Sequence, residues 1–128
     1  MFLNTIAVFL GGGLGAVLRY FTSLLYLRIF DGNFPLATLS VNLVGSLLMG
    51  LLGAFLQGNE DISEHMKYAL TVCLCGGFTT FSKFAFEIVE ILRRGEIFIA
   101  IYYMILSIFL CVLIAAAGFY WAKNYVYY

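Results

Sequence analysis

The chain reads Gly76-Gly77-Phe78-Thr79-Thr80-Phe81-Ser82-Lys83-Phe84 near its middle, a polar and aromatic stretch inside sequence that is otherwise typical of lipid-soluble helix. Polar groups and broken backbone are costly at the depth of a bilayer, so they persist mainly where they face protein or a water-filled path. Two glycines and two threonines, with phenylalanines just beyond them, therefore predict a broken membrane helix that lines something.

The composition around this stretch indicates a membrane protein. The 128 residues are 63% hydrophobic and only 11% charged, and the mean hydropathy is +1.00. A soluble domain carries roughly a quarter charged residues. The formal net charge is zero and there is no basic tail, so nucleic acid is not expected as a partner.

Four charge-free stretches locate the membrane spans. They cover residues 2–18, 32–59, 68–82 and 97–122. A spanning helix needs about 20 mostly apolar residues, so the first and third spans must take in Arg19 and Lys83 at or near their ends. The sequence predicts one all-α domain, residues 1–128, with helices at about 4–30, 35–56, 67–92 and 97–122. We expect the third helix to be broken near its middle, at 76–80.

The positive charges that flank these spans give no clear orientation. Lys67 and Lys123 fall on one side, against Arg28, Arg93 and Arg94 on the other, and the N-terminal amine levels the tally. Either a small protein has a weak signal, or copies insert both ways and pair antiparallel. Small residues spaced four apart, such as Gly11 with Gly15 and Ser46 with Gly50, favour close helix packing in either case.

Ionisable residues inside spans are functional candidates, and here they are Arg19, Lys83 and Glu87. Two of the three are cationic, which favours an anion as the ligand. There are simpler roles for each of them. Lys83 and Glu87 are four apart and can pair on one helix face, while Arg19 can extend to the interface.

Polar residues also recur every fourth position on two helices. They are Thr38, Asn42 and Ser46 on the second span, and Tyr103, Ser107 and Cys111 on the fourth. Each stripe alone suits hydrogen bonding between helices. Together with the break, the two stripes favour a lined path, and their N–H and O–H donors suit an anion that sheds water.

The interrupted stretch offers two further kinds of ligand. Phe81 and Phe84 are three apart, so both rings can face one side. The edge of an aromatic ring is positive and can meet an anion in a narrow pore, although packing in the core or against lipid is the commoner role of phenylalanine. Carbonyls freed at 76–79 would form an oxygen-lined site suited to a hard cation.

Nothing in the sequence predicts an enzyme. Cys73, Cys75 and Cys111 have apolar neighbours and no metal-ligand spacing, and His65 stands alone in a polar loop. Paired carboxylates, a nucleophile with its base and a phosphate-binding loop are all absent from the sequence.

Three motifs resemble one family, the Fluc (CrcB) fluoride channels of microbes. They are Gly76–Ser82, Gly12-Gly13-Leu14-Gly15-Ala16-Val17-Leu18-Arg19-Tyr20 and Asn42-Leu43-Val44-Gly45-Ser46. The resemblance covers all four spans, and the motifs occur in the right order. It implies a passive channel that exports fluoride across the plasma (inner) membrane, built as an antiparallel, dual-topology homodimer with two pores.

The resemblance also implies roles for individual residues. The expected fluoride-pore residues are Thr38, Asn42, Phe81, Ser82, Phe84, Tyr103 and Ser107. Arg19, Lys83 and Glu87 are expected at a vestibule. The backbone carbonyls of Gly76 and Thr79 are expected to hold a structural sodium ion (Na+) between the two subunits.

Two residues depart from the family pattern. Lys83 stands where the family usually has threonine, and Cys111 stands where a hydroxyl is expected. Lys83 can attract fluoride to a pore mouth, pair with Glu87 or plug one route. By the motif alone, Lys83→Thr is expected to preserve or raise flux. The departures leave open that the chain is one subunit of a heterodimeric fluoride channel. A proton-coupled small multidrug exporter is a further alternative, disfavoured because the first, second and fourth spans lack a central carboxylate.

Overall fold

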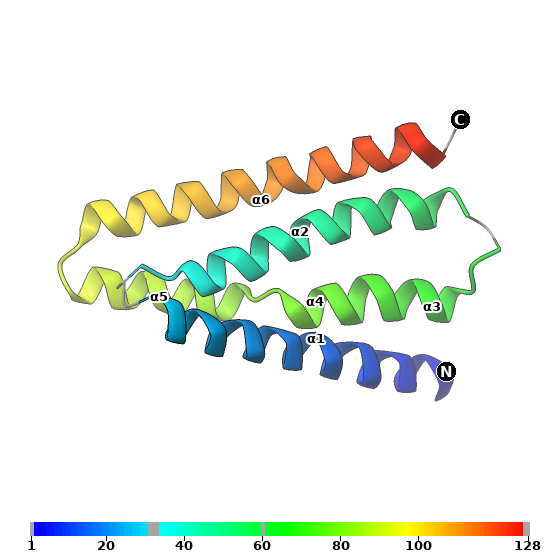
Figure 1. Cartoon of the computed structure of the whole chain (residues 1–128), viewed down its shortest axis with the longest axis horizontal. Helices are drawn as coiled ribbons and strands as arrows, with labels where there is room; N and C mark the ends of the chain where they lie inside the picture. The colour runs from blue at the N-terminus through cyan, green and yellow to red at the C-terminus, as the bar shows by residue number, and fades with distance from the viewer. Residues whose placement is uncertain (1, 31–33, 60, 127–128) are drawn as a thin grey trace.

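The computed structural model of the chain describes residues 2–30, 34–59 and 61–126, without the side chains of 72–74 and 126. Within these ranges every regular element is helical, and four helices are long and apolar enough to cross a membrane. Three of them are α1 (Phe2–Ile29), α2 (Leu36–Gln57) and α6 (Ile97–Val126), while the third span runs over Glu64–Arg93. Figure 1 shows the four spans lying side by side along the long axis of the molecule. The predicted all-α class is confirmed.

The third span is built from several pieces. Its parts are α3 (Glu64–Tyr68), a π-helical segment η1 (Ala69–Cys75), α4 (Gly76–Phe78) and α5 (Phe81–Arg93). Ser63 caps the start of α3, where its side chain accepts a hydrogen bond from the backbone N–H of Met66. The wider turns of η1 are not foreseen from hydrophobic periodicity, which assumes 3.6 residues per turn.

The predicted break in the third span is present, but it is shorter than expected. Thr79 and Thr80 alone are extended, with φ/ψ of −76°/159° and −150°/116°. Gly76 and Gly77, which we expected inside the break, are still helical. Glycine inside a helix costs only about 1 kcal/mol relative to alanine, so two glycines weaken the helix without ending it.

Glycines bring the helix backbones into close contact. A Cβ added to Gly50 of α2 would collide with the carbonyl of Ala115 in α6, and one added to Gly118 would lie 2.9 Å from the carbonyl oxygen of Leu47. On the other side, a Cβ on Gly77 would collide with the backbone of Gly12 in α1. The bundle is therefore two close helix pairs, α2 with α6 and α1 with the third span.

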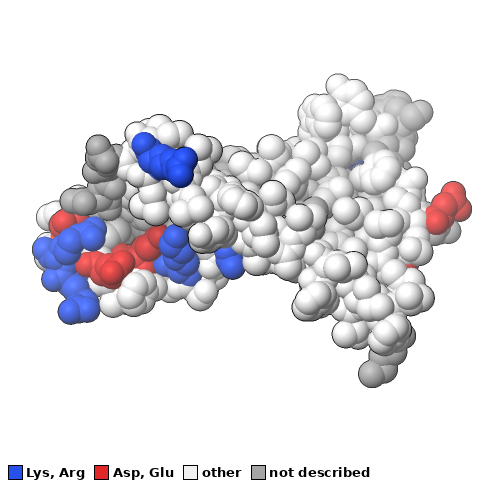
Figure 2. Space-filling view, turned by 60° about the horizontal axis from the view of Figure 1, so that its bottom comes forward, with Lys and Arg blue, Asp and Glu red and all other residues white. Residues whose placement is uncertain are grey.

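The outer surface is apolar over most of its length. Large side chains such as Phe98, which is 89% exposed, face outwards along all four spans. Charged side chains gather towards the ends of the molecule and leave a white middle belt in Figure 2. A surface of this kind suits lipid and not water, and the chain is a multi-pass membrane protein.

Candidate functional site

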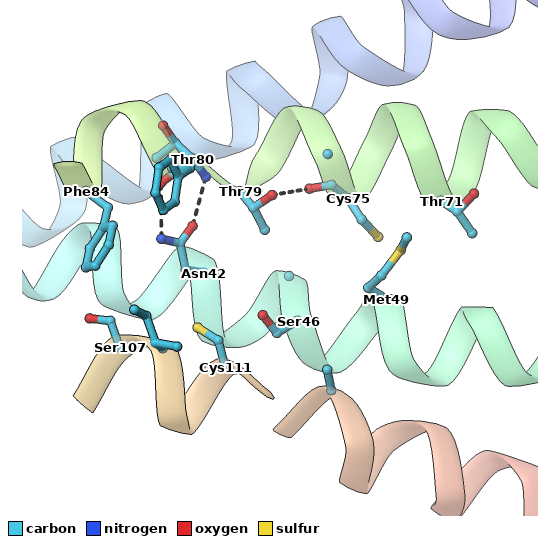
Figure 3. A pocket seen from close by; sticks show the side chains of 15 residues that line it. Asn42, Ser46, Met49, Thr71, Cys75, Thr79, Thr80, Phe84, Ser107 and Cys111 are labelled. Atoms are coloured by element: carbon cyan, nitrogen blue, oxygen red, sulfur yellow. Dashed lines mark hydrogen bonds between the residues drawn. The ribbon is translucent and has the colours of Figure 1, made fainter. Parts of the chain in front are cut away.

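A cavity of about 520 Å³ lies between α2, α6 and the broken third span. Figure 3 shows the side chains around it. The lining is neutral throughout: polar groups come from Asn42, Ser46, Thr71, Thr79, Thr80 and Ser107, and the remainder is apolar, aromatic, glycine or cysteine. The cavity therefore offers dipoles and ring edges instead of charges.

Asn42 clamps the break from the neighbouring helix. The backbone N–H of Thr80 donates to Asn42 Oδ1 at 2.8 Å, and Asn42 Nδ2 donates back to the carbonyl of Thr80 at 3.2 Å, as the dashed lines in Figure 3 show. The Thr80 hydroxyl then caps α5 by accepting from the N–H of Lys83 at 3.3 Å. A primary amide has two N–H donors, and the second of Asn42 has no acceptor among the described residues.

The same clamp changes the backbone one turn earlier. Because the Thr80 N–H is taken by Asn42, it does not make the helical bond to the carbonyl of Gly76. Gly76 is exposed and lines the cavity, so it is accessible to a cation of the kind expected there. The carbonyl of Thr79, the second expected ligand, accepts a hydrogen bond from Arg19 Nη1 at 3.2 Å. A site with oxygen ligands alone suits sodium. One of the two expected oxygens, the carbonyl of Thr79, is also the hydrogen-bond acceptor of Arg19.

Arg19 therefore lies against the break. Its side chain, on α1, is partly buried and does not extend to the end of the helix. This contact joins residues 60 positions apart, which helical spacing does not reveal.

The two expected aromatic residues lie together. Phe81 and Phe84 both line the cavity, with ring centroids 5.7 Å apart. Phe84 is buried and meets the ring of Tyr103 edge to face at 5.2 Å, whereas Phe81 is 76% exposed. Ser82 lies between them in sequence but is exposed and does not line this cavity.

Ser107 carries an unusual hydroxyl. The residue is only 4% exposed and lines the cavity, and its Oγ has no hydrogen-bond partner within 3.5 Å in the described part of the chain, with only a longer, weaker contact to the Tyr103 hydroxyl. Leaving a buried hydroxyl without a partner costs about 1–3 kcal/mol. An atom of this kind is expected where a ligand completes the site. Cys111, one turn further along α6, lines the same cavity as a free thiol.

Thr38 and Tyr103 lie away from this cavity and contact Glu87. Thr38 Oγ1 donates to Glu87 Oε1 at 2.6 Å, and the Tyr103 hydroxyl donates to Oε2 at 2.9 Å. Lys83 Nζ lies 3.9 Å from Oε1, so the expected pairing four residues apart is present. The two polar stripes are thus divided between a neutral cavity and a carboxylate cluster, which we call the Glu87 cluster (Thr38, Lys83, Glu87 and Tyr103).

The remaining candidates have structural surroundings. Cys75 is buried and its carbonyl accepts from both the N–H and the hydroxyl of Thr79, at 3.0 and 3.1 Å. The side chain of Cys73 lies outside the described residues. His65 contacts Asn4 at the exposed end of the bundle. Sequence reasoning missed Thr80 as an individual site residue, although a threonine three residues before Lys83 has the spacing of a helix cap.

Comparisons with known proteins agree on one group. The family model described as CrcB-like protein, Camphor Resistance (CrcB), matches residues 6–119. A protein of Flavobacterium psychrophilum is 42% identical over 115 residues, covering 90% of this chain and 93% of its own. One from Francisella tularensis is 40% identical over 124 residues (94% and 95%), and one from Clostridium perfringens is 40% identical over 116 (91% and 91%). Each of the three is named a fluoride-specific ion channel FluC.

Proposed function

Because the chain belongs to the CrcB family, we propose that it is a fluoride-selective passive ion channel. The observation that carries the proposal is Ser107, a buried residue of the cavity lining whose hydroxyl has no hydrogen-bond partner within 3.5 Å in the described part of the chain. With the second N–H of Asn42 it provides donors for a small anion that has shed its water.

The cavity lining supports an anion over a cation. Phe81 and Phe84 add ring edges, which are positive, and the lining holds no acidic side chain. A proton-coupled exporter of cations needs a carboxylate that protons and substrate share. The cavity lacks one, so the exporter alternative is not supported.

The direction of transport follows from the chemistry of hydrogen fluoride. The neutral acid crosses lipid and ionises inside a cell, and the resulting ion cannot recross because a bare charge in hydrocarbon is very costly. A conduit in the plasma (inner) membrane of a microbe then lets fluoride leave down its own gradient and lowers its toxicity.

An antiparallel homodimer with two pores is part of the proposal. Its support is the balanced charge tally, the exposed ring of Phe81 and the exposed Gly76 beside the cavity. Sodium would be held by the carbonyls of Gly76 and Thr79 from both copies, supplying positive charge at their interface. Asn42 keeps the Gly76 carbonyl available by holding the N–H that would otherwise bond to it.

The test is fluoride efflux from liposomes that contain this chain alone. Phe81→Ile with Phe84→Ile is expected to lower the initial rate about hundredfold, because aliphatic side chains have no positive edge. The two-chain species should persist on size exclusion. The matched control is Phe98→Ile with Phe109→Ile, two exposed rings on α6, which should keep the rate.

Unchanged efflux in the Phe81 and Phe84 variant would refute the pore assignment. Efflux that starts only when a second, non-identical family member is added would support the heterodimer alternative instead.

A further inference from the structure

A second, smaller cavity of about 260 Å³ lies between α1, α2 and α5. Its polar lining includes Ser23, Tyr26, Lys83, Glu87 and Glu90. Glu87 lines this cavity, and Tyr103 both donates to the Glu87 carboxylate and packs against Phe84, which lines the large cavity. The Glu87 cluster therefore separates the two cavities.

Glu87 presents a negative charge at this point. Its two oxygens each accept a hydrogen bond from a buried hydroxyl. The side chain is only 15% exposed, so water screens it poorly. Thr38 and Tyr103 satisfy the oxygens but bring no positive charge.

Lys83 is the cation at this carboxylate. Its Nζ lies 3.9 Å from Glu87 Oε1, and in the described part of the chain no other ion pair involves Glu87. The separation is too long for a hydrogen bond, so the ammonium keeps its donors. The lysine side chain is 48% exposed and lines the second cavity.

We propose that Lys83 is a conduction-determining residue, whose ammonium offsets the charge of Glu87 at the wall of the second cavity. The inference rests on the proposed fluoride path. It reverses the expectation from the motif that Lys83→Thr preserves or raises flux. Removing the ammonium leaves Glu87, and Glu90 on the wall of the same cavity, uncompensated beside the proposed path of an anion.

The experiment compares initial fluoride efflux from liposomes for the wild type and three variants. Lys83→Met keeps the length of the side chain without its charge and should lower the rate about tenfold. Lys83→Arg retains the charge and should stay within about threefold of the wild type. Lys83→Met with Glu87→Gln removes both charges and should recover most of the lost rate, because glutamine can still accept from Thr38.

The matched control is Lys123→Met, which removes one exposed lysine near the end of α6 and should leave the rate unchanged. Recovery in the double variant separates a charge effect from damage to the fold. An active wild type with unchanged or faster efflux in Lys83→Met would overturn this inference alone, as would a slow Lys83→Met that Glu87→Gln does not rescue. A wild type that is silent both alone and with a second family member would overturn the proposed function, and this inference with it.

Discussion

The large cavity and the Glu87 cluster are built from the same two polar stripes, but they use their hydrogen-bond donors in opposite ways. At the cavity, hydrogen bonds hold a backbone break open while Ser107 and Asn42 keep spare donors. In the cluster, two side-chain hydroxyls are spent on one carboxylate. A second anion about 4 Å from such a carboxylate is repelled by about 4 kcal/mol at an effective dielectric constant of 20. Free hydrogen-bond donors therefore indicate where an anion can bind. A carboxylate whose oxygens are already hydrogen-bonded indicates where the anion is repelled unless a cation lies nearby.

Asn42→Ala should give the largest effect, because it removes the clamp that creates the cavity. Thr80 would keep a buried N–H without an acceptor, and two hydrogen bonds would be lost. We expect a loss of about 2–4 kcal/mol in stability, seen as a lower melting temperature in detergent, together with loss of fluoride efflux.

The control for that variant is Asn59→Ala, which loses an exposed hydrogen bond to the carbonyl of Phe55 and should cost under about 0.5 kcal/mol. Equal melting temperatures for the two variants would show that the break does not depend on Asn42.

Ser107→Ala separates the two regions most directly. The hydroxyl has no hydrogen-bond partner within 3.5 Å, so its removal should not lower stability and can raise it by up to about 1–3 kcal/mol, while efflux falls about tenfold. Thr38→Val is the counterpart in the Glu87 cluster: it removes a bonded hydroxyl and should cost about 1.5–3 kcal/mol. Thermal unfolding and liposome efflux together check both. If Ser107→Ala lowers stability as much as Thr38→Val, the Ser107 hydroxyl has a structural role and the assignment of a fluoride site to it is wrong.

Cys111→Ser should have the smallest effect. A hydroxyl is a better donor than a thiol, and position 111 lines the large cavity one turn beyond Ser107. We expect efflux to rise about twofold, with Cys111→Ala showing no such gain. Serine and alanine variants with the same rate would place the ion elsewhere along the cavity.

Much of the fold could be predicted from the sequence. Charge-free stretches are enough to place four helices once the first and third are extended past Arg19 and Lys83, and the Gly76–Phe84 stretch is enough to predict a break in the third. The length of the break is not predictable in this way. It depends on Asn42, a residue of α2 that accepts a hydrogen bond from the backbone N–H of Thr80. Thr80 is therefore outside the helix, whereas Gly76 is still helical.

The site was predicted less completely. Periodicity shows that Thr38 and Asn42 share one face of a helix, but it does not show which neighbour each meets. Asn42 reaches the break and Thr38 reaches Glu87, because the third span passes α2 at an angle that a single helix does not encode. The contact between Arg19 and the carbonyl of Thr79 has the same origin. The sodium site and the roles of the pore residues stay predictions.

The glycine contacts between helices bear on whether the helices can move relative to one another during transport. Where Gly50 meets Ala115 and Gly77 meets Gly12, not even a methyl group fits between the backbones. Packing this close has little compressibility, so these contacts hold the paired helices at a fixed separation. A carrier must alternate between two shapes and can sort its cargo at each turnover. A passive channel has no second selection step, so it must discriminate between ions by the chemistry of its lining alone.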